Sequence, residues 1–224
     1  MLSIAIDGPA GAGKSTIART AAGALRFIYV DTGALYRAIG YHGLQVGADL
    51  TDTAAIKALL PGLQVDLRFV EGQQRVFVGG EDVSDFIRSP QVSKAASQVS
   101  AVQEVRDFLM ETQRSLARKN SVIMDGRDIG TVVLPDADLK IFLTASPEAR
   151  AQRRCKELEE KGSPMPYEEV LRDIQQRDYD DSHREAAPLK QAADAVLVDT
   201  SELNLAESVD AVCTLIRQRL GDRL

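Results

Sequence analysis

The residues best suited to chemistry form a short glycine-rich segment near the start of the chain. Its sequence is Gly8-Pro9-Ala10-Gly11-Ala12-Gly13-Lys14-Ser15, which fits the pattern G-x-x-x-x-G-K-[ST]. Backbone N–H groups of such a loop and the N-terminus of the next helix converge on one anion, with the lysine on the outer phosphates and the hydroxyl on Mg²⁺. A turn that only allows close packing explains the glycines but not the lysine and hydroxyl. The segment therefore predicts a nucleoside triphosphate site.

A nucleoside triphosphate site of this kind requires a strand before the loop and a helix after it. An apolar run at residues 2–6 predicts a strand before the loop, and residues 15–25 predict a helix after it. Further strands are predicted at 27–30, 122–124, 139–143 and 195–198, and further helices at 102–118, 147–161, 167–177 and 205–220. Strands that alternate with helices indicate an α/β fold with a five-stranded parallel sheet covered by helices on both faces.

One region interrupts this alternation. Residues 63–70 and 75–78 alternate polar and apolar side chains on either side of the polar segment 71–74, which predicts a β-hairpin. Gly79-Gly80 and Ser89-Pro90 then punctuate the path back to the helix at residue 102. We expect an inserted subdomain from about residue 62 to residue 100, with antiparallel strands of its own.

Composition limits the class of protein. The chain has 224 residues, 44% of them hydrophobic, enough for one α/β domain with insertions. Its net charge of −6 argues against nonspecific binding to nucleic acid. The apolar stretches are far shorter than the roughly 18 residues that span a bilayer, and Asp7 interrupts the first one too early for a signal peptide. Cys155 and Cys213 have no C-x-x-C companion, so we expect reduced thiols in a cytoplasmic protein.

Three further polar clusters accompany the glycine-rich segment. Each is expected at a strand end or in a loop, and in an open α/β sheet the carboxyl ends of strands face the ligand crevice. No N-K-x-D element is present, which disfavours a GTPase. Arginines gathered in an acidic protein suit a small anionic ligand. The clusters are residues 31–33 with Tyr36 and Arg37, residues 125–131, and residues 177–184.

Together these segments resemble the bacterial cytidylate kinases. The resemblance runs in order from Ile4 to about Asp199 and rests on the glycine-rich loop and on residues 31–37, 96–99, 105–106, 125–131, 135–137 and 187–189. It implies the nucleoside monophosphate kinase fold, with an inserted antiparallel subdomain and a lid. It also implies transfer of the γ-phosphoryl group of ATP to CMP or dCMP, with Mg²⁺, in pyrimidine nucleotide metabolism.

The resemblance also divides the chain. We expect a single kinase domain over residues 1–224, with a core at 1–61, 101–150 and 167–224, a CMP-binding insert at about 62–100, and a lid at about 151–166. The expected partners are small nucleotides, without a nucleic acid polymer or a membrane, and the expected state is a monomer.

Site residues follow from the resemblance. ATP is assigned to the loop and its continuation, Gly8, Pro9, Ala10, Gly11, Ala12, Gly13, Lys14, Ser15 and Thr16, with Ser15 as a possible Mg²⁺ ligand. The catalytic cations are Lys14, Arg127, Arg177, Arg153 and Arg154, the last two in the lid over ATP. Thr32, Arg37 and Arg127 are assigned to the acceptor phosphate, Arg177 to ribose and phosphates, and Asp181 to the sugar hydroxyl, although Asp180 is an alternative to Asp181. Ser97, Arg106, Asp128 and Arg184 are assigned to the base.

The choice of base has a chemical reason. Cytosine presents an amino donor beside the N3 and O2 acceptors, so a carboxylate and a guanidinium together can read it. Uracil would turn an acceptor toward the carboxylate, a mismatch that such a site rejects. Arg106 and Asp128 could instead form a structural ion pair. The alternative functions are a kinase of UMP or another small metabolite, which would not need Ser97, Arg106 and Asp128 together, and a non-catalytic ATP-binding switch.

Overall fold

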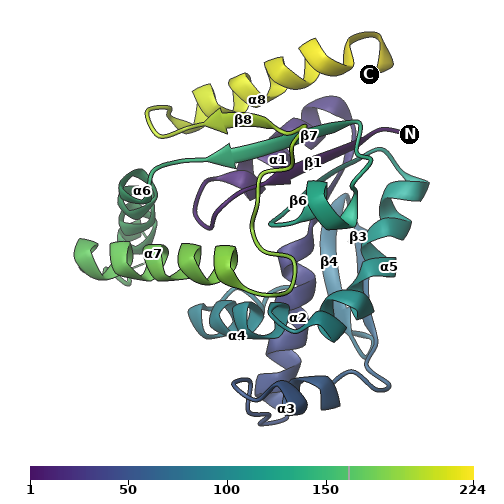
Figure 1. Cartoon of the computed structure of the whole chain (residues 1–224), viewed down its shortest axis with the longest axis vertical. Coiled ribbons are helices and arrows are strands. Elements are labelled where there is room, and N and C mark those ends of the chain that lie inside the picture. The colour runs from purple at the N-terminus through teal and green to yellow at the C-terminus, as the bar shows by residue number, and fades with distance from the viewer. Residues whose placement is uncertain (161) are drawn as a thin grey trace. The chain divides into compact units, whose positions relative to one another are not determined.

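The chain folds into two compact units. The computed structural model describes residues 1–160 and 162–224, shown in Figure 1. One unit comprises Met1–Tyr29 and Asn120–Leu224, and the other comprises Val30–Lys119. Each unit has a hydrophobic core of its own. Lys161, which we predicted in the turn of the lid, lies outside the described residues.

The first unit is built on a five-stranded sheet in the order β2-β6-β1-β7-β8, and the chain passes from the first unit to the second within β2. Strand β1 runs parallel to both of its neighbours, with Ile4 opposite Ile123 on one side and Leu139 on the other. Both faces of β1 and β6 are buried, which is why these strands are nearly continuous apolar runs. The predicted parallel sheet is confirmed. Its strands are β1 (Ser3–Asp7), β2 (Ile28–Asp31), β6 (Val122–Gly126), β7 (Leu139–Thr144) and β8 (Val196–Asp199).

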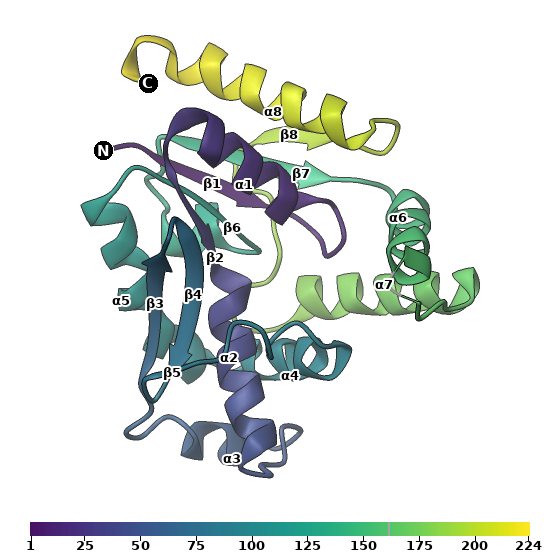
Figure 2. The same cartoon turned by 180° about the vertical axis from the view of Figure 1, so that it is seen from behind.

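Two helices of this unit share a core with the sheet. Ile17 and Ala18 of α1 (Lys14–Leu25) cluster with Val212 and Ile216 of α8 (Leu205–Leu220) and with the apolar side chains of β1 and β7. Figure 2 shows both helices alongside these strands. Helix α8 begins with a capping box formed by Asn204 and Glu207.

The remaining helices of this unit follow the strand ends. Strand β7 leads into α6 (Pro147–Glu160), which packs against α7 (Tyr167–His183) through a small core of Ala151, Leu158 and Val170. A five-residue π-helical turn, η1 (Ile129–Val133), follows β6, and a 3₁₀ turn, η2 (Gly221–Arg223), ends the chain. Across the described part of the chain, no helix has the length and apolar character needed to cross a membrane.

The second unit combines helices with a three-stranded antiparallel sheet. Val65 lies opposite Val78 and Val70 lies opposite Gln73, so the predicted hairpin is confirmed. Glu71 and Gly72, both at positive φ, form its two-residue turn. The elements are α2 (Thr32–Gln45), α3 (Thr53–Ala58), β3 (Val65–Val70), β4 (Gln73–Val78), β5 (Glu81–Asp82), α4 (Pro90–Ser100) and α5 (Gln103–Lys119).

Two helices differ from the sequence prediction. Ser89 and Pro90, which we took as loop punctuation, begin α4, where the Ser89 hydroxyl oxygen accepts a hydrogen bond from the Val92 N–H and Pro90 occupies the first helical position. Helix α7 continues to His183, so the segment 177–183 is helical and the loop expected there was wrong. The segment contains neither glycine nor proline, and nothing in it stops the helix.

The first residue of the phosphate loop generates a stability prediction. Gly8 has φ +150°, and a Cβ at this position would lie 1.9 Å from the carbonyl oxygen of Leu143. We expect Gly8→Ala to lower the free energy of unfolding by at least about 2 kcal/mol, because strain and overpacking act together. Gly23→Ala is the matched control, since nothing lies within 4 Å of its added methyl group, and it should stabilise α1 by about 0.5–1 kcal/mol. Urea denaturation checks both, and equal stability of the two variants would contradict the prediction.

Candidate active site

The phosphate loop lies between β1 and α1, as the motif requires. Gly11 and Gly13 both have positive φ, and Gly13 directly precedes the helix. Lys14 begins the helix, is only 5% exposed, and its Nζ donates to the Pro9 carbonyl oxygen at 2.7 Å. The first N–H groups of the helix and the lysine therefore meet at one loop, which suits an anion.

Beside this loop stand a hydroxyl and a carboxylate. The Ser15 Oγ donates to Asp125 Oδ2 at 2.9 Å, and the Tyr29 hydroxyl donates to Asp125 Oδ1 at 2.9 Å. Hard oxygen donors of this kind suit Mg²⁺. The described residues contain no group of three or more His, Cys, Asp or Glu side chains that could hold a metal. The pair therefore fits a Mg²⁺ ion that takes its other ligands from phosphate oxygens and water.

A row of alternating charges, which we call the charge row, lies in the same unit. Arg127 Nε donates to Asp181 Oδ2 at 2.8 Å. Arg184 lies 3.8 Å from Asp181 and 4.0 Å from Asp128. The charge row thus comprises Arg127, Asp181, Arg184 and Asp128, and it brings four predicted site residues together.

Helix α7 explains how the charge row is assembled. Arg177, Asp181 and Arg184 lie four and three residues apart at the end of this helix, a spacing that places side chains on one face. The sequence predicted this helix only as far as Arg177. Its continuation to His183 is what brings Arg177, Asp181 and Arg184 close together. Arg184, at the C-cap, donates from Nε and Nη2 to the Ala187 carbonyl oxygen at 2.9 and 2.7 Å.

Burial and charge together set the protonation of the site. Burial lowers the pKa of Lys14 well below its ordinary value, and the neighbouring Arg127 lowers it further. Burial also opposes the charge of Arg127, but Asp181, Asp125 and Asp7 outweigh it and raise its pKa. Burial similarly disfavours the charge of Asp181, yet Arg127, Arg177 and Arg184 hold its pKa below the ordinary range. The two cations thus depend on nearby carboxylates.

The second unit holds four of the other predicted residues, and Thr32 and Arg37 are the first two of these. Thr32 is the buried first residue of α2, and Asp31 caps this helix by accepting from the Ala34 N–H at 3.0 Å. Arg37 Nη2 lies 2.6 Å from Asp31 Oδ2. Gln74 on β4 accepts from the Asp31 N–H at 2.8 Å and donates to its carbonyl oxygen at 3.2 Å. This amide, which the sequence did not single out, holds the segment that carries Thr32.

Ser97 and Arg106 lie on successive helices of the same unit. Ser97 is half-buried on α4, and Arg106 on α5 is 2% exposed. Arg106 Nη1 donates to the Ser100 carbonyl oxygen at 3.0 Å, and its guanidinium lies 5.4 Å from the centre of the Tyr36 ring. The Arg106 guanidinium is therefore held in place by its contacts with α4 and α2.

Comparison with known proteins decides the family. The cytidylate kinase family matches residues 4–218. The chain belongs to the cytidylate kinase family. A cytidylate kinase of Caldicellulosiruptor saccharolyticus is 48% identical over 223 residues, covering 100% of this chain and 99% of the relative. One of Exiguobacterium sp. is 50% identical over 217 residues, 97% of each. A solved structure of an uncharacterized protein from Eubacterium ventriosum shares the fold with a TM-score of 0.53 and 14% identity, covering 98% of this chain and all of that one.

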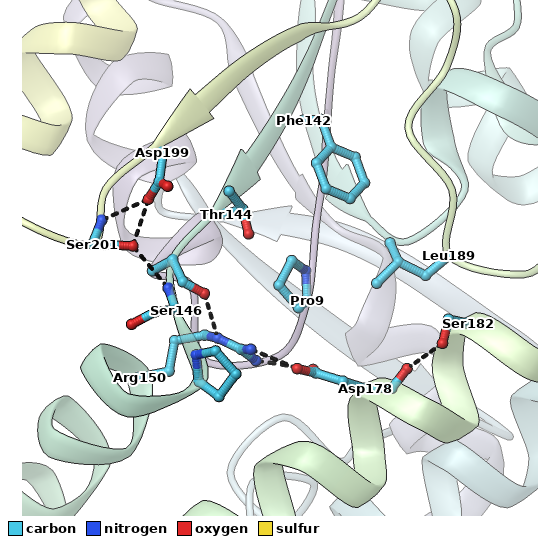
Figure 3. A pocket seen from close by; sticks show the side chains of 12 residues that line it. Pro9, Phe142, Thr144, Ser146, Arg150, Asp178, Ser182, Leu189, Asp199 and Ser201 are labelled. Atoms are coloured by element: carbon cyan, nitrogen blue, oxygen red, sulfur yellow. Dashed lines mark hydrogen bonds and ion pairs between the residues drawn. The ribbon is translucent and has the colours of Figure 1, made fainter.

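Family membership confirms the resemblance drawn from the sequence, and the structure adds a pocket beside the phosphate loop. The pocket has a volume of about 450 Å³ and lies within the first unit. Pro9, Phe142 and Leu189 give it an apolar lining, and Thr144, Ser146, Asp199 and Ser201 give it a polar one, as Figure 3 shows. Such a lining suits a flat base with polar edges.

Arg150, which the sequence did not single out, joins this pocket to the phosphate loop. It is 2% exposed and donates to the carbonyl oxygens of Ala10 and Ala145, each at 2.9 Å. Its guanidinium also forms a two-point ion pair with Asp178 of α7, visible in Figure 3. Arg150 therefore connects α6, α7 and the loop.

The two predicted lid arginines make different contacts from Arg150. Arg153 donates to the carbonyl oxygens of Thr200 and Leu203, and Arg154 pairs with Glu157 at 2.7 Å. Their assignment to ATP remains a prediction. The signal that could have found Arg150 is its spacing, since it lies three and four residues before them on the same helix.

A pH dependence follows from the buried carboxyl of Asp7. Burial raises its pKa from 3.8 to about 6, and Asp128 raises it while Lys14 and two backbone N–H groups lower it. The folded state therefore binds this proton more tightly than the unfolded chain does. The contribution of Asp7 to the free energy of unfolding should rise as the pH falls from about 6 to about 4, by up to about 3 kcal/mol.

Asp7→Asn removes this titration. The difference in unfolding free energy between the parent chain and this variant, measured by urea denaturation without nucleotide, should favour the parent more at pH 4.5 than at pH 7. A difference that does not change with pH would contradict the raised pKa.

Proposed function

We propose that this chain transfers the γ-phosphoryl group of ATP to CMP and dCMP, producing CDP, dCDP and ADP. One observation carries the proposal beyond family membership. Lys14 is a buried cation and Arg127 a partly buried cation of the same unit, and each is balanced by carboxylates that anionic phosphates could replace. Joining two phosphates requires this compensation, because at about 4 Å each pair of unit charges repels by roughly 4 kcal/mol at an effective dielectric constant near 20.

The donor nucleotide is assigned to the first unit. The β- and γ-phosphates bind the ammonium of Lys14 and the N–H groups of the loop 8–16, in which Pro9 has none. Ser15 and Asp125 would hold Mg²⁺, which supplies further neutralisation of the phosphate charge. We assign the base and ribose of ATP to the pocket lined by Pro9 and Arg150, because this pocket adjoins the loop.

The acceptor is assigned to the residues that the family resemblance names. Thr32, Arg37 and Arg127 bind its phosphate, Arg177 binds ribose and phosphates, and Asp181 accepts from the sugar hydroxyl. Ser97, Arg106, Asp128 and Arg184 bind cytosine. These roles follow from the family resemblance and are supported by the burial of Arg106, Asp128 and Asp181 among polar partners.

The phosphoryl transfer itself requires that the reacting phosphate oxygens are aligned and that their negative charge is neutralised. A phosphate oxygen of CMP forms a bond to the γ-phosphorus while the bond to the β–γ bridging oxygen breaks, and ADP leaves with that electron pair. The acceptor phosphate is largely dianionic at pH 7, because its second pKa is near 6. No side chain therefore has to act as a base. Lys14, Arg127 and Arg177 hold the oxygens in line and neutralise their charge.

The working parts are proposed as a core at 1–61, 101–150 and 167–224, a CMP-binding insert at about 62–100, and a lid at about 151–166 whose Arg153 and Arg154 cover ATP. We further propose a monomer in the cytoplasm, consistent with the free thiols of Cys155 and Cys213. Formation of ADP from ATP in the presence of CMP, dCMP, UMP and a non-nucleotide alcohol in turn separates this proposal from other small-metabolite kinases. No ADP with any acceptor would leave only a nucleotide-binding switch.

Lys14 provides the first functional prediction. Its ammonium is the phosphate-loop cation, so Lys14→Met should reduce kcat by several orders of magnitude while the far-UV spectrum and melting temperature change little. Lys119→Met, an exposed lysine at the end of α5, is the control and should keep full turnover. A coupled ADP assay decides, and near-normal turnover of the Lys14 variant would refute the assignment.

Asp128 provides the second functional prediction. If its carboxylate accepts from the cytosine amino group, Asp128→Asn should reduce discrimination between CMP and UMP by about 1–3 kcal/mol, or about 5- to 150-fold. The amide can donate to O4 of uracil. Asp136→Asn, an exposed aspartate in the following loop, should leave the ratio unchanged. Equal proportional losses of kcat/KM for both acceptors in the Asp128 variant would assign that residue a structural role instead.

A further inference from the structure

Asp7 is a buried carboxylate to which the proposed mechanism assigns no contact with ATP or CMP. It ends β1, directly before the phosphate loop, and is 4% exposed. Its Oδ1 accepts from the Ile129 N–H at 2.8 Å, and its Oδ2 accepts from the Gly130 N–H at 2.7 Å. Both oxygens are therefore committed to the first two residues of the π-helical turn that follows Asp128.

These two bonds replace an ordinary helix cap. The first N–H groups of a helical turn have no partner within the turn and usually bond to the side chain of the preceding residue. Here the preceding residue is Asp128, and its side chain makes no capping bond. Asp7 supplies the cap from a strand more than 120 residues earlier in the sequence. The Asp128 carboxylate can then lie toward Arg184, 4.0 Å away, in the charge row.

We infer that Asp7 is a positioning residue for acceptor recognition, which fixes the backbone after Asp128 and ties it to the phosphate loop. The inference rests on the proposed role of Asp128 in binding cytosine. Because Gly8 follows Asp7 directly, the donor loop and the residue that reads the acceptor base share one carboxylate as an anchor. Asparagine cannot replace it, since its amide offers one acceptor oxygen and would turn an N–H donor toward a second N–H.

The chain contains a matched control at the other end of the same strand. Asp138 Oδ2 accepts from the Ser3 N–H at 2.8 Å and from the Ser3 hydroxyl. Asp138 thus accepts a backbone hydrogen bond at the first residue of β1. Asp7, the last residue of β1 and next to the loop, accepts two such bonds. If Asp7 only stabilises the sheet, Asp7→Asn and Asp138→Asn should have comparable consequences.

The experiment compares these two variants with the parent chain. Steady-state kinetics with CMP, UMP and ATP should show that Asp7→Asn lowers kcat/KM for CMP at least 10-fold and reduces the preference for CMP over UMP, while KM for ATP changes less than 3-fold. Hydrogen exchange of the Ile129 and Gly130 amides should accelerate in the same variant. Asp138→Asn should leave all of these values within about 2-fold.

A second variant protects the test against failure of Asp7→Asn to fold. A Cβ at Gly130 would lie 3.3 Å from Asp7 Oδ2 and 3.1 Å from Lys140 Cδ, so Gly130→Ala should displace the turn while Asp7 remains. It should reduce CMP selectivity in the same direction by a smaller factor. Unchanged selectivity in both variants, or equal losses for CMP and ATP with unchanged exchange at Ile129 and Gly130, would overturn the inference. Failure of the parent chain to phosphorylate CMP would refute the proposed function instead.

Discussion

The first unit must keep positive charge buried beside the phosphate loop. Burial opposes the charge of both Lys14 and Arg127, and the two cations also repel each other, which lowers the pKa of Lys14. Carboxylates hold them in the absence of nucleotide: Asp181 bonds Arg127 directly, and Asp125 and Asp7 add their charges. Much of the local structure holds these carboxylates close to the two cations. When nucleotides bind, phosphate oxygens can replace the carboxylates as the partners of Lys14 and Arg127.

The elements that supply this balance also position the rest of the site. Strand β1 brings Asp7 and the loop, β6 brings Asp125 and is followed directly by Arg127, and α7 brings Arg177 and Asp181 with Arg184 at its C-cap. Arg150 connects the loop to α7 through Asp178. In the second unit, Gln74 performs a comparable task by bonding both backbone polar groups of Asp31. Polar side chains that bond backbone groups thus hold the segments that carry the candidate binding residues.

The sequence predicted local features well, because local spacing encodes them. The phosphate loop and the hairpin around Glu71 and Gly72 each depend on residues a few positions apart. Helix α4 was missed because Ser89 and Pro90 can begin a helix or a loop. The end of α7 was wrongly expected to be a loop, although the spacing of Arg177 and Asp181 fits a helix.

The residues that the sequence missed have partners distant in sequence. Asp7, Gln74 and Arg150 bond backbone atoms that lie 122, 43 and 140 residues away. A backbone partner leaves no residue type to recognise, so no motif reveals the contacts of Asp7 and Gln74, and the spacing of Arg150 from Arg153 and Arg154 marks the residue but not its partners. Only the folded chain brings them together.

The most direct test of the central claim is a crystal structure with a bisubstrate inhibitor in which cytidine and adenosine are joined by a chain of phosphates. The Lys14 ammonium should leave the Pro9 carbonyl oxygen for a phosphate oxygen, and the Nη atoms of Arg127 should contact the phosphate chain. An inhibitor held by other side chains, with Lys14 still bonded to Pro9 and Arg127 remote from every phosphate, would contradict the account.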